Sequence, residues 1–113
     1  MESVALDTNL IVNFILKTQL TSRAKDILRF VFKSYQPVLF TNTVEESIFI
    51  LVREELKTHG ISKFYEQRDY LKRKGYSKLT LHKKFVEFVE DLNIPVLENR
   101  CGLDELVRNY GKI

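Results

Sequence analysis

The sequence predicts an α/β protein, a three-layer α/β/α arrangement built on a short parallel sheet. Short apolar runs alternate along the chain with longer segments in which apolar residues recur at helical spacing. The apolar runs lack polar alternation, which is typical of parallel strands covered on both faces. The chain has 113 residues, the size of one domain. Because it shows no linker and no internal repeat, we treat residues 1–113 as a single domain.

The first half of the chain predicts two strands and three helices. In chain order they are a strand over 3–7, helices over 9–17 and 22–35, a strand over 38–41 and a helix over 43–58. Thr21 and Ser22 offer an N-cap for the second helix, and Pro37 ends it. Gly60 ends the third helix.

The second half predicts a basic segment over 62–74, a helix over 77–92, a strand over 94–98 and a short last helix over 103–110. Ser62 would cap the basic segment. Most phenylalanines are expected in the core: Phe14, Phe30, Phe32, Phe40, Phe49, Phe85 and Phe88. Strands joined by helices in this order form a parallel sheet with right-handed connections. Binding sites in such sheets lie at the carboxyl ends of the strands.

Composition and charge exclude several classes of protein. With 44% hydrophobic and 29% charged residues, and only four Gly and two Pro, the chain is neither collagen-like nor disordered. Its one cysteine excludes a disulfide framework and a cysteine-based zinc site. No segment reaches the roughly 18 apolar residues that span a bilayer. The N-terminus has no basic region of a signal peptide, so we expect a cytoplasmic protein without a membrane partner.

Asp7 stands where the first strand ends. A carboxylate held by a rigid strand suits a metal ligand or a general base, and the neighbouring Thr8 and Asn9 can orient it through hydrogen bonds. The alternative interpretation is structural, because Asp7 or Thr8 could simply cap the following helix.

Glu46 lies near the start of the third helix. Its structural alternative is a capping box, because Thr43 and Glu46 have the Thr-x-x-Glu spacing. If the first two strands end at one edge of the sheet, Asp7 and Glu46 face each other there. Two neighbouring carboxylates repel, and oxygen ligands select Mg²⁺ or Mn²⁺, so this pair predicts a divalent cation.

Positive charge is concentrated in residues 57–84. This stretch holds nine Lys or Arg against Glu66 and Asp69, a net charge of +7, whereas the rest of the chain holds nine basic and thirteen acidic residues, a net charge of −4. Aromatic residues are interleaved with these cations, a pattern that suits a nucleic acid backbone. A solvated helix face with its lysines laid over apolar surface explains the pattern equally well.

Two segments together resemble the PIN domain family, which includes the VapC-type toxins of toxin–antitoxin pairs. The first is Val4-Ala5-Leu6-Asp7-Thr8-Asn9, and the second is Thr41-x-Thr43-Val44-Glu45-Glu46-Ser47-Ile48-Phe49-Ile50-Leu51. The resemblance implies a parallel sheet between helices and Mg²⁺- or Mn²⁺-dependent endonucleolytic cleavage of RNA. Asp7 and Glu46 match the first two family acids and are the expected catalytic and metal-binding residues.

The resemblance also implies supporting roles. Thr8, Asn9 and Thr41 would orient the ligands or contact phosphate. The basic segment would bind RNA, chiefly through Lys63, Arg68, Lys72, Arg73 and Lys74. An antitoxin-like protein partner is implied by the toxin branch of the family.

The chain departs from the family pattern at its C-terminal end, where the third and fourth family acids and the last two strands are expected. Such a domain would leave its first strand at an edge of the sheet, where pairing with another chain, and hence a homo-oligomer, is expected. Two alternatives remain open. One is a non-catalytic PIN-like module that binds RNA or protein, and the other is an α/β interaction protein in which Asp7 and Glu46 are only caps.

Overall fold

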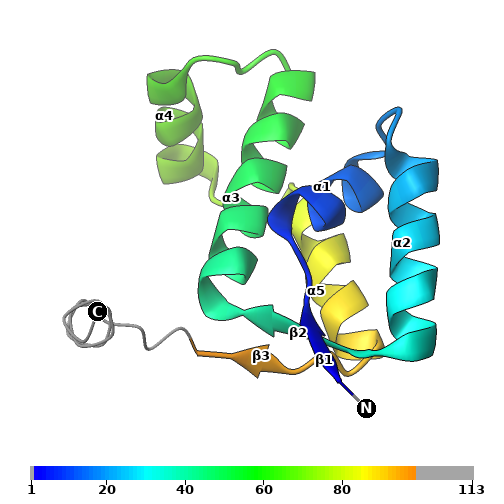
Figure 1. Ribbon diagram of the computed structural model, residues 1–113. Coiled ribbons are helices and arrows are strands. Elements are labelled where there is room, and N and C mark those ends of the chain that lie inside the picture. The colour runs from blue at the N-terminus through cyan, green and yellow to red at the C-terminus, as the bar shows by residue number, and fades with distance from the viewer. Residues whose placement is uncertain (1, 99–113) are drawn as a thin grey trace, which may run out of the picture.

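The computed structural model describes residues 2–98 and confirms an α/β fold with a parallel sheet. Eight elements follow in chain order (Figure 1): β1 (Ser3–Ala5), α1 (Thr8–Leu16), α2 (Thr21–Ser34), β2 (Gln36–Phe40), α3 (Thr41–Thr58), α4 (Phe64–Lys74), α5 (Leu81–Asp91) and β3 (Val96–Leu97). The expected last helix over 103–110 lies outside the described residues. Within residues 2–98, no helix combines the length and the hydropathy needed to cross a membrane.

The three strands lie in the order β1-β2-β3, and both pairs are parallel. Pro37 sits inside the central strand, where a missing N–H would normally cost a ladder bond. It is tolerated because β3 pairs with β2 only from Leu39 onward, so no β3 residue stands opposite Pro37. In the part of the chain that the structure describes, β1 pairs only with β2 and is an edge strand, as expected.

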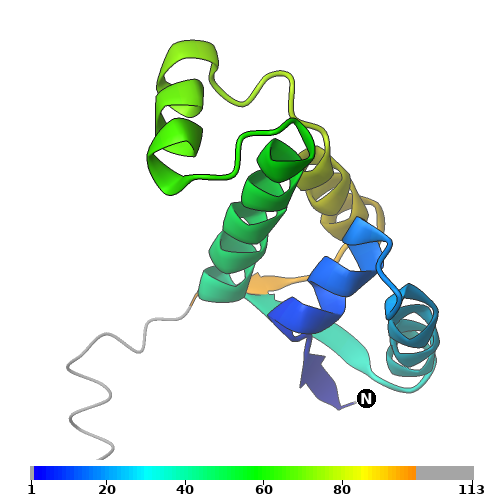
Figure 2. The same ribbon diagram turned by 90° about the horizontal axis from the view of Figure 1, so that it is seen from above.

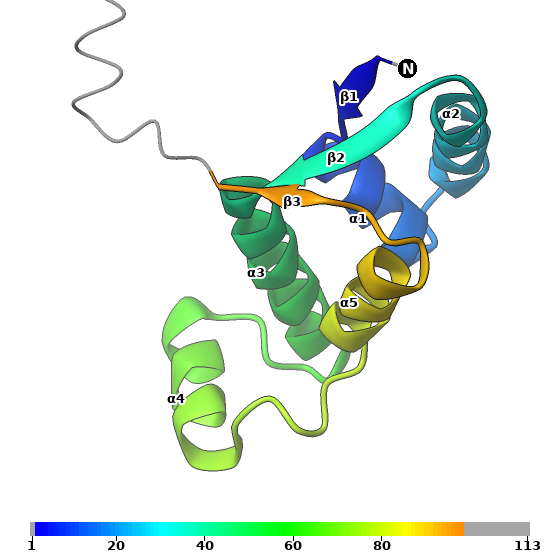
Figure 3. The ribbon, with the colours of Figure 1, turned by 90° about the horizontal axis from the view of Figure 1, so that it is seen from below.

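All described helices lie on one side of the sheet. Both connections step in the same direction, from β1 to β2 and from β2 to β3, so right-handed crossovers place their helices on the same face. Figure 1 shows the helices above the strands, and the view from below in Figure 3 shows the strands in front of the helices. A second helical layer would have to come from outside residues 2–98, so the three-layer arrangement stays a prediction.

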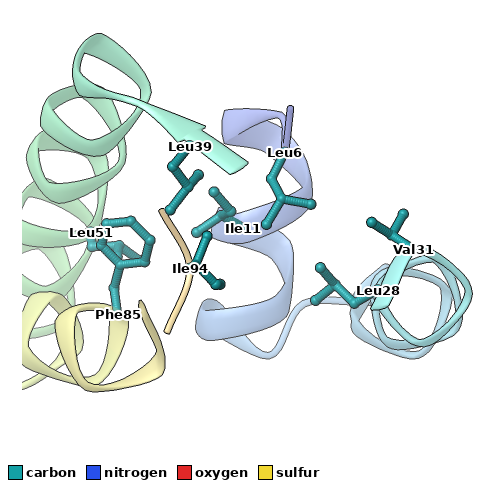
Figure 4. Close-up of a cluster of buried hydrophobic side chains, with 8 residues drawn as sticks. All are labelled: Leu6, Ile11, Leu28, Val31, Leu39, Leu51, Phe85 and Ile94. Carbon is teal, nitrogen blue, oxygen red and sulfur yellow. The ribbon is translucent and has the colours of Figure 1, made fainter. Parts of the chain in front are cut away.

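The main core lies between the sheet and helices α1, α2, α3 and α5. Figure 4 shows its buried members: Leu6, Ile11, Leu28, Val31, Leu39, Leu51, Phe85 and Ile94. A smaller cluster of Val52, Leu56 and Leu79 packs against Tyr70 and Leu71 of α4. In Figure 2, α3 and α5 lie side by side while α4 stands apart from both. The helix α4 is therefore held to the molecule mainly through this second cluster.

The helix starts differ from the expected ones. Helix α2 begins at Thr21, whose hydroxyl donates to the Asn13 carbonyl at 2.8 Å instead of capping its own helix. Helix α3 begins at Thr41 with Phe40 as its N-cap residue. Helix α4 begins at Phe64 rather than at the expected Ser62. In each case, the described side chain at the N-cap position makes no capping hydrogen bond.

Candidate functional site

The ends of β1 and β2 place Asp7 and the start of α3 at the same edge of the sheet. Leu6, the residue before Asp7, donates its backbone N–H to the Val38 carbonyl at 3.0 Å. Asp7 is the N-cap residue of α1, yet its side chain makes no capping hydrogen bond. Asp7 thus occupies the expected N-cap position but lacks the side-chain hydrogen bond by which a cap stabilises its helix. Its exposed carboxylate has no hydrogen-bond or ion-pair partner within residues 2–98.

Glu46 is brought to this edge by α3. The Thr8 hydroxyl donates to Glu46 Oε2 at 3.3 Å, which joins the first turn of α1 to α3 across 38 residues of sequence. Because α3 already starts at Thr41, Thr43 is not its N-cap residue and the capping box does not form. The structural alternative for Glu46 is therefore wrong.

The other expected site residues lie nearby with different local roles. The Thr41 hydroxyl donates to the Leu97 carbonyl at 3.1 Å, which ties the start of α3 to the end of β3. Asn9 is exposed, and its backbone carbonyl accepts from the Asn13 side chain at 2.8 Å. Glu98 follows β3, so all three strands are followed at this edge by an acidic residue or by the helix that carries one.

The donor set at this edge is compatible with the chemistry of Mg²⁺ or Mn²⁺. It consists of oxygen atoms from Asp7, Glu46 and Thr8, and hard divalent cations prefer oxygen ligands. Within residues 2–98, no Lys or Arg forms a salt bridge with either carboxylate. The described residues do not assemble a group of three or more acidic, His or Cys side chains. Among residues 2–98, Asp7 and Glu46 are the two carboxylates from which we argue this site.

The expected RNA-binding cations lie on and beside α4. Lys63, Arg68, Lys72, Arg73 and Lys74 are all exposed, and the last three fill the final turn of the helix. Basic residues at a helix C-terminus also complement the helix dipole. The dipole accounts only for the cations of the last turn. Lys63 is the N-cap residue and Arg68 lies near the middle of the helix, so the dipole does not explain these two.

Sequence reasoning missed Glu55, a carboxylate that is only 8% exposed. Its two oxygens accept the backbone N–H groups of Thr80 at 2.9 and 3.0 Å and of Leu81 at 2.8 Å. Glu55 of α3 therefore caps the N-terminus of α5, which is why α5 starts at Leu81 and not at the expected residue 77. The signal was present in the sequence, because Glu55 interrupts the apolar stripe formed by Leu51, Val52 and Leu56.

The expectation that the phenylalanines form the core is wrong at two positions. Phe30 is 61% exposed and Phe49 is 52% exposed, whereas Phe85 is fully buried. Phe49 lies on the same side of α3 as the buried Val52 and Leu56, three and seven residues later. Unlike them, it is left uncovered at the N-terminal part of this face, in the space between α3 and α4.

No protein-family model, curated protein or solved structure matches this chain. The geometry of the sheet edge and the charge of α4 are thus the observations from which a function is argued.

Proposed function

We propose that this chain is a metal-dependent endoribonuclease of the PIN type, with a three-layer α/β/α domain as its fold. The observation that carries the proposal is the contact between Thr8 and Glu46. This hydrogen bond joins the start of α1, which follows Asp7, to the part of α3 that carries Glu46. The two segments meet at the carboxyl edge of a parallel sheet, where such folds place their sites. Asp7 and Glu46 are the proposed ligands of Mg²⁺ or Mn²⁺.

Each residue has a distinct task in this proposal. A bound divalent cation supplies an activated water and neutralises charge on the phosphodiester. Asp7 offers a carboxylate whose oxygens are unpaired within residues 2–98 and whose direction is set by the end of β1. The Thr8 hydroxyl holds Glu46 Oε2 and so restricts the rotation of that carboxylate. Asn9, exposed on the first turn of α1, is placed to contact phosphate or solvent at the same edge.

A second candidate function is RNA binding without cleavage, favoured by the exposed cations of α4. These side chains do not depend on a metal, and they bind polyanions through release of counterions. Partners of the proposed enzyme are RNA, an antitoxin-like protein and a second copy of the chain that pairs along β1.

The test is cleavage of single-stranded RNA by the 113-residue chain, with Mn²⁺ and with EDTA. We expect cutting in Mn²⁺ only, and a loss of about 100-fold or more in Asp7→Asn and in Glu46→Gln, because the lost metal–ligand interactions are worth several kcal/mol at about 1.4 kcal/mol per tenfold. Glu54→Gln is the matched control, since Glu54 lies on the same helix and pairs with exposed Lys57 instead of lying at the sheet edge. Binding of RNA without any cutting by the folded chain would support the second function and exclude the first.

A further inference from the structure

A groove of about 400 Å³ lies between α3 and α4, next to the candidate site. Its wall on α3 starts at Glu45, the residue before Glu46, and continues one turn later with Phe49. Glu46 and Phe49 are three residues apart, about 4.5 Å along the helix axis. A ligand that lies in the groove therefore reaches close to the proposed metal ligand.

Three aromatic side chains of the groove are exposed to an unusual degree. Phe49 of α3 is 52% exposed, Phe64 at the start of α4 is 65% exposed, and Tyr76 between α4 and α5 is 52% exposed. They come from three separate segments and line one space. Large exposed apolar side chains gathered in this way mark a binding surface.

Cations accompany these rings. The Arg53 guanidinium lies 5.6 Å from the centre of the Phe49 ring, and Arg68 of α4 lines the opposite wall. Glu45 is the one acidic residue among the groove-lining residues. Aromatic rings for stacking beside cations for phosphate are the elements of single-stranded nucleic acid binding. An amphipathic partner helix would need the apolar surface but not the arginines.

The buried wall of the groove carries unpaired polar atoms. Gln67 is 3% exposed, and its Nε2 donates to the Ile61 carbonyl at 2.9 Å and to the Arg53 carbonyl at 3.3 Å. These two acceptors fix the amide orientation, so Oε1 is left as an acceptor without a partner among the described residues. Arg53 Nε is a donor without a partner there as well. Both atoms have almost no exposed surface, so a ligand in the groove does not reach them without rearrangement.

We propose that this groove binds an unpaired base of a single-stranded RNA, next to the phosphate held at the Asp7–Glu46 edge. Phe49, Phe64 and Tyr76 enclose and stack on the base, and Arg53 and Arg68 neutralise the flanking phosphates. The choice of RNA as the ligand rests on the proposed function.

The test is binding of a fluorescein-labelled single-stranded RNA of ten nucleotides to the full chain, measured by anisotropy in EDTA. Stacked bases contribute enough that we expect Phe49→Ala and Tyr76→Ala to bind about fivefold more weakly or worse. Phe49→Tyr retains the ring and keeps wild-type affinity. Phe30→Ala is the matched control, because Phe30 is even more exposed than Phe49 but lies on α2, outside the groove-lining residues. Circular dichroism verifies that each variant is folded.

A second probe separates the base from the backbone. An oligonucleotide of the same length that lacks its bases should bind the wild type at least as weakly as the complete RNA binds Phe49→Ala, and Phe49→Ala should not weaken it further. Equal binding of both oligonucleotides by the wild type, or unchanged RNA binding by folded Phe49→Ala, would overturn the proposal. A Phe49→Ala variant that binds RNA normally but loses self-association in sedimentation would assign the groove to a protein contact instead.

Because binding is measured in EDTA, its outcome is independent of cleavage. If Phe49→Ala loses RNA binding and the wild type shows no Mn²⁺-dependent cleavage, base binding in the groove is supported and the nuclease function is contradicted. If Asp7→Asn abolishes cleavage and Phe49→Ala binds RNA normally, the nuclease function is supported and base binding in the groove is contradicted.

Discussion

The two ends of α3 carry glutamates in opposite circumstances. Glu55, near the C-terminal end, is buried and has both oxygens paired with the backbone of α5. Glu46, near the N-terminal end, is exposed and has one contact of 3.3 Å with Thr8. A buried carboxylate is tolerated only when it is paired, so Glu55 stabilises the fold. Exposed carboxylates with few partners, as at Glu46 and Asp7, stay available for a ligand.

The largest effect that separates the two ends is expected from Glu55→Ala. Loss of this carboxylate leaves the partly buried N–H groups of Thr80 and Leu81 without their partner and removes the cap of α5, which should lower the free energy of unfolding by about 2 kcal/mol. Urea unfolding of the full chain measures this change. The neighbouring Glu54→Ala removes an exposed ion pair and should change it by less than about 0.5 kcal/mol. Equal values for the two variants would contradict the capping role.

At the candidate site we expect the opposite of Glu55. A bound metal ion should raise the free energy of unfolding, whereas the two carboxylates without metal should contribute little to it. Mn²⁺ at ten times its dissociation constant should raise the free energy of unfolding by about 1.4 kcal/mol. Asp7→Asn and Glu46→Gln should abolish this gain, while their metal-free stability stays within about 0.5 kcal/mol of the wild type. Thermal unfolding with Mn²⁺ and with EDTA measures both quantities. An equal gain in the two variants would place the metal elsewhere.

A smaller effect is expected from Thr8→Val, which removes the contact that restrains Glu46. The affinity for Mn²⁺ should fall by about tenfold, the lower end for residues that orient metal ligands, because the contact is long and exposed. The free energy of unfolding should change by less than about 1 kcal/mol. Calorimetric titration with Mn²⁺ measures the affinity, and Thr8→Ser should restore it. An unchanged affinity in Thr8→Val would mean that Thr8 does not position Glu46.

The sequence was informative where local patterns decide the structure. The apolar runs and helical spacings predicted the order of strands and helices from β1 to β3, because these signals extend over only a few residues. The position of Asp7 after β1 followed directly from that order. The prediction that Asp7 and the start of α3 share one edge needed one further rule, that parallel strands end at the same edge of the sheet. The hydrogen bond from Thr8 to Glu46 was not predicted, because Thr8 was expected to orient Asp7.

Long-range contacts explain what the sequence did not predict. Helix α5 starts at Leu81 because a carboxylate 26 positions earlier in the chain accepts its first N–H groups. Helix α2 has no side-chain cap because the Thr21 hydroxyl bonds to α1. The groove between α3 and α4 could not be predicted, because it depends on how α4 returns toward α3 and on which side of each helix is left uncovered.

The segment over residues 61–80 leaves and returns at nearly the same point of the molecule. Ile61 donates its N–H to the Leu56 carbonyl at 2.9 Å, and Thr80 donates to the Glu55 carboxylate. The residues between them, including α4, form a long insertion whose two ends meet at the last turns of α3. Doubling the length of a loop with fixed ends costs only about 0.6 kcal/mol in loop entropy. In evolutionary terms, this segment can be lengthened, shortened or exchanged without rebuilding the sheet edge, so that recognition and chemistry can diverge separately.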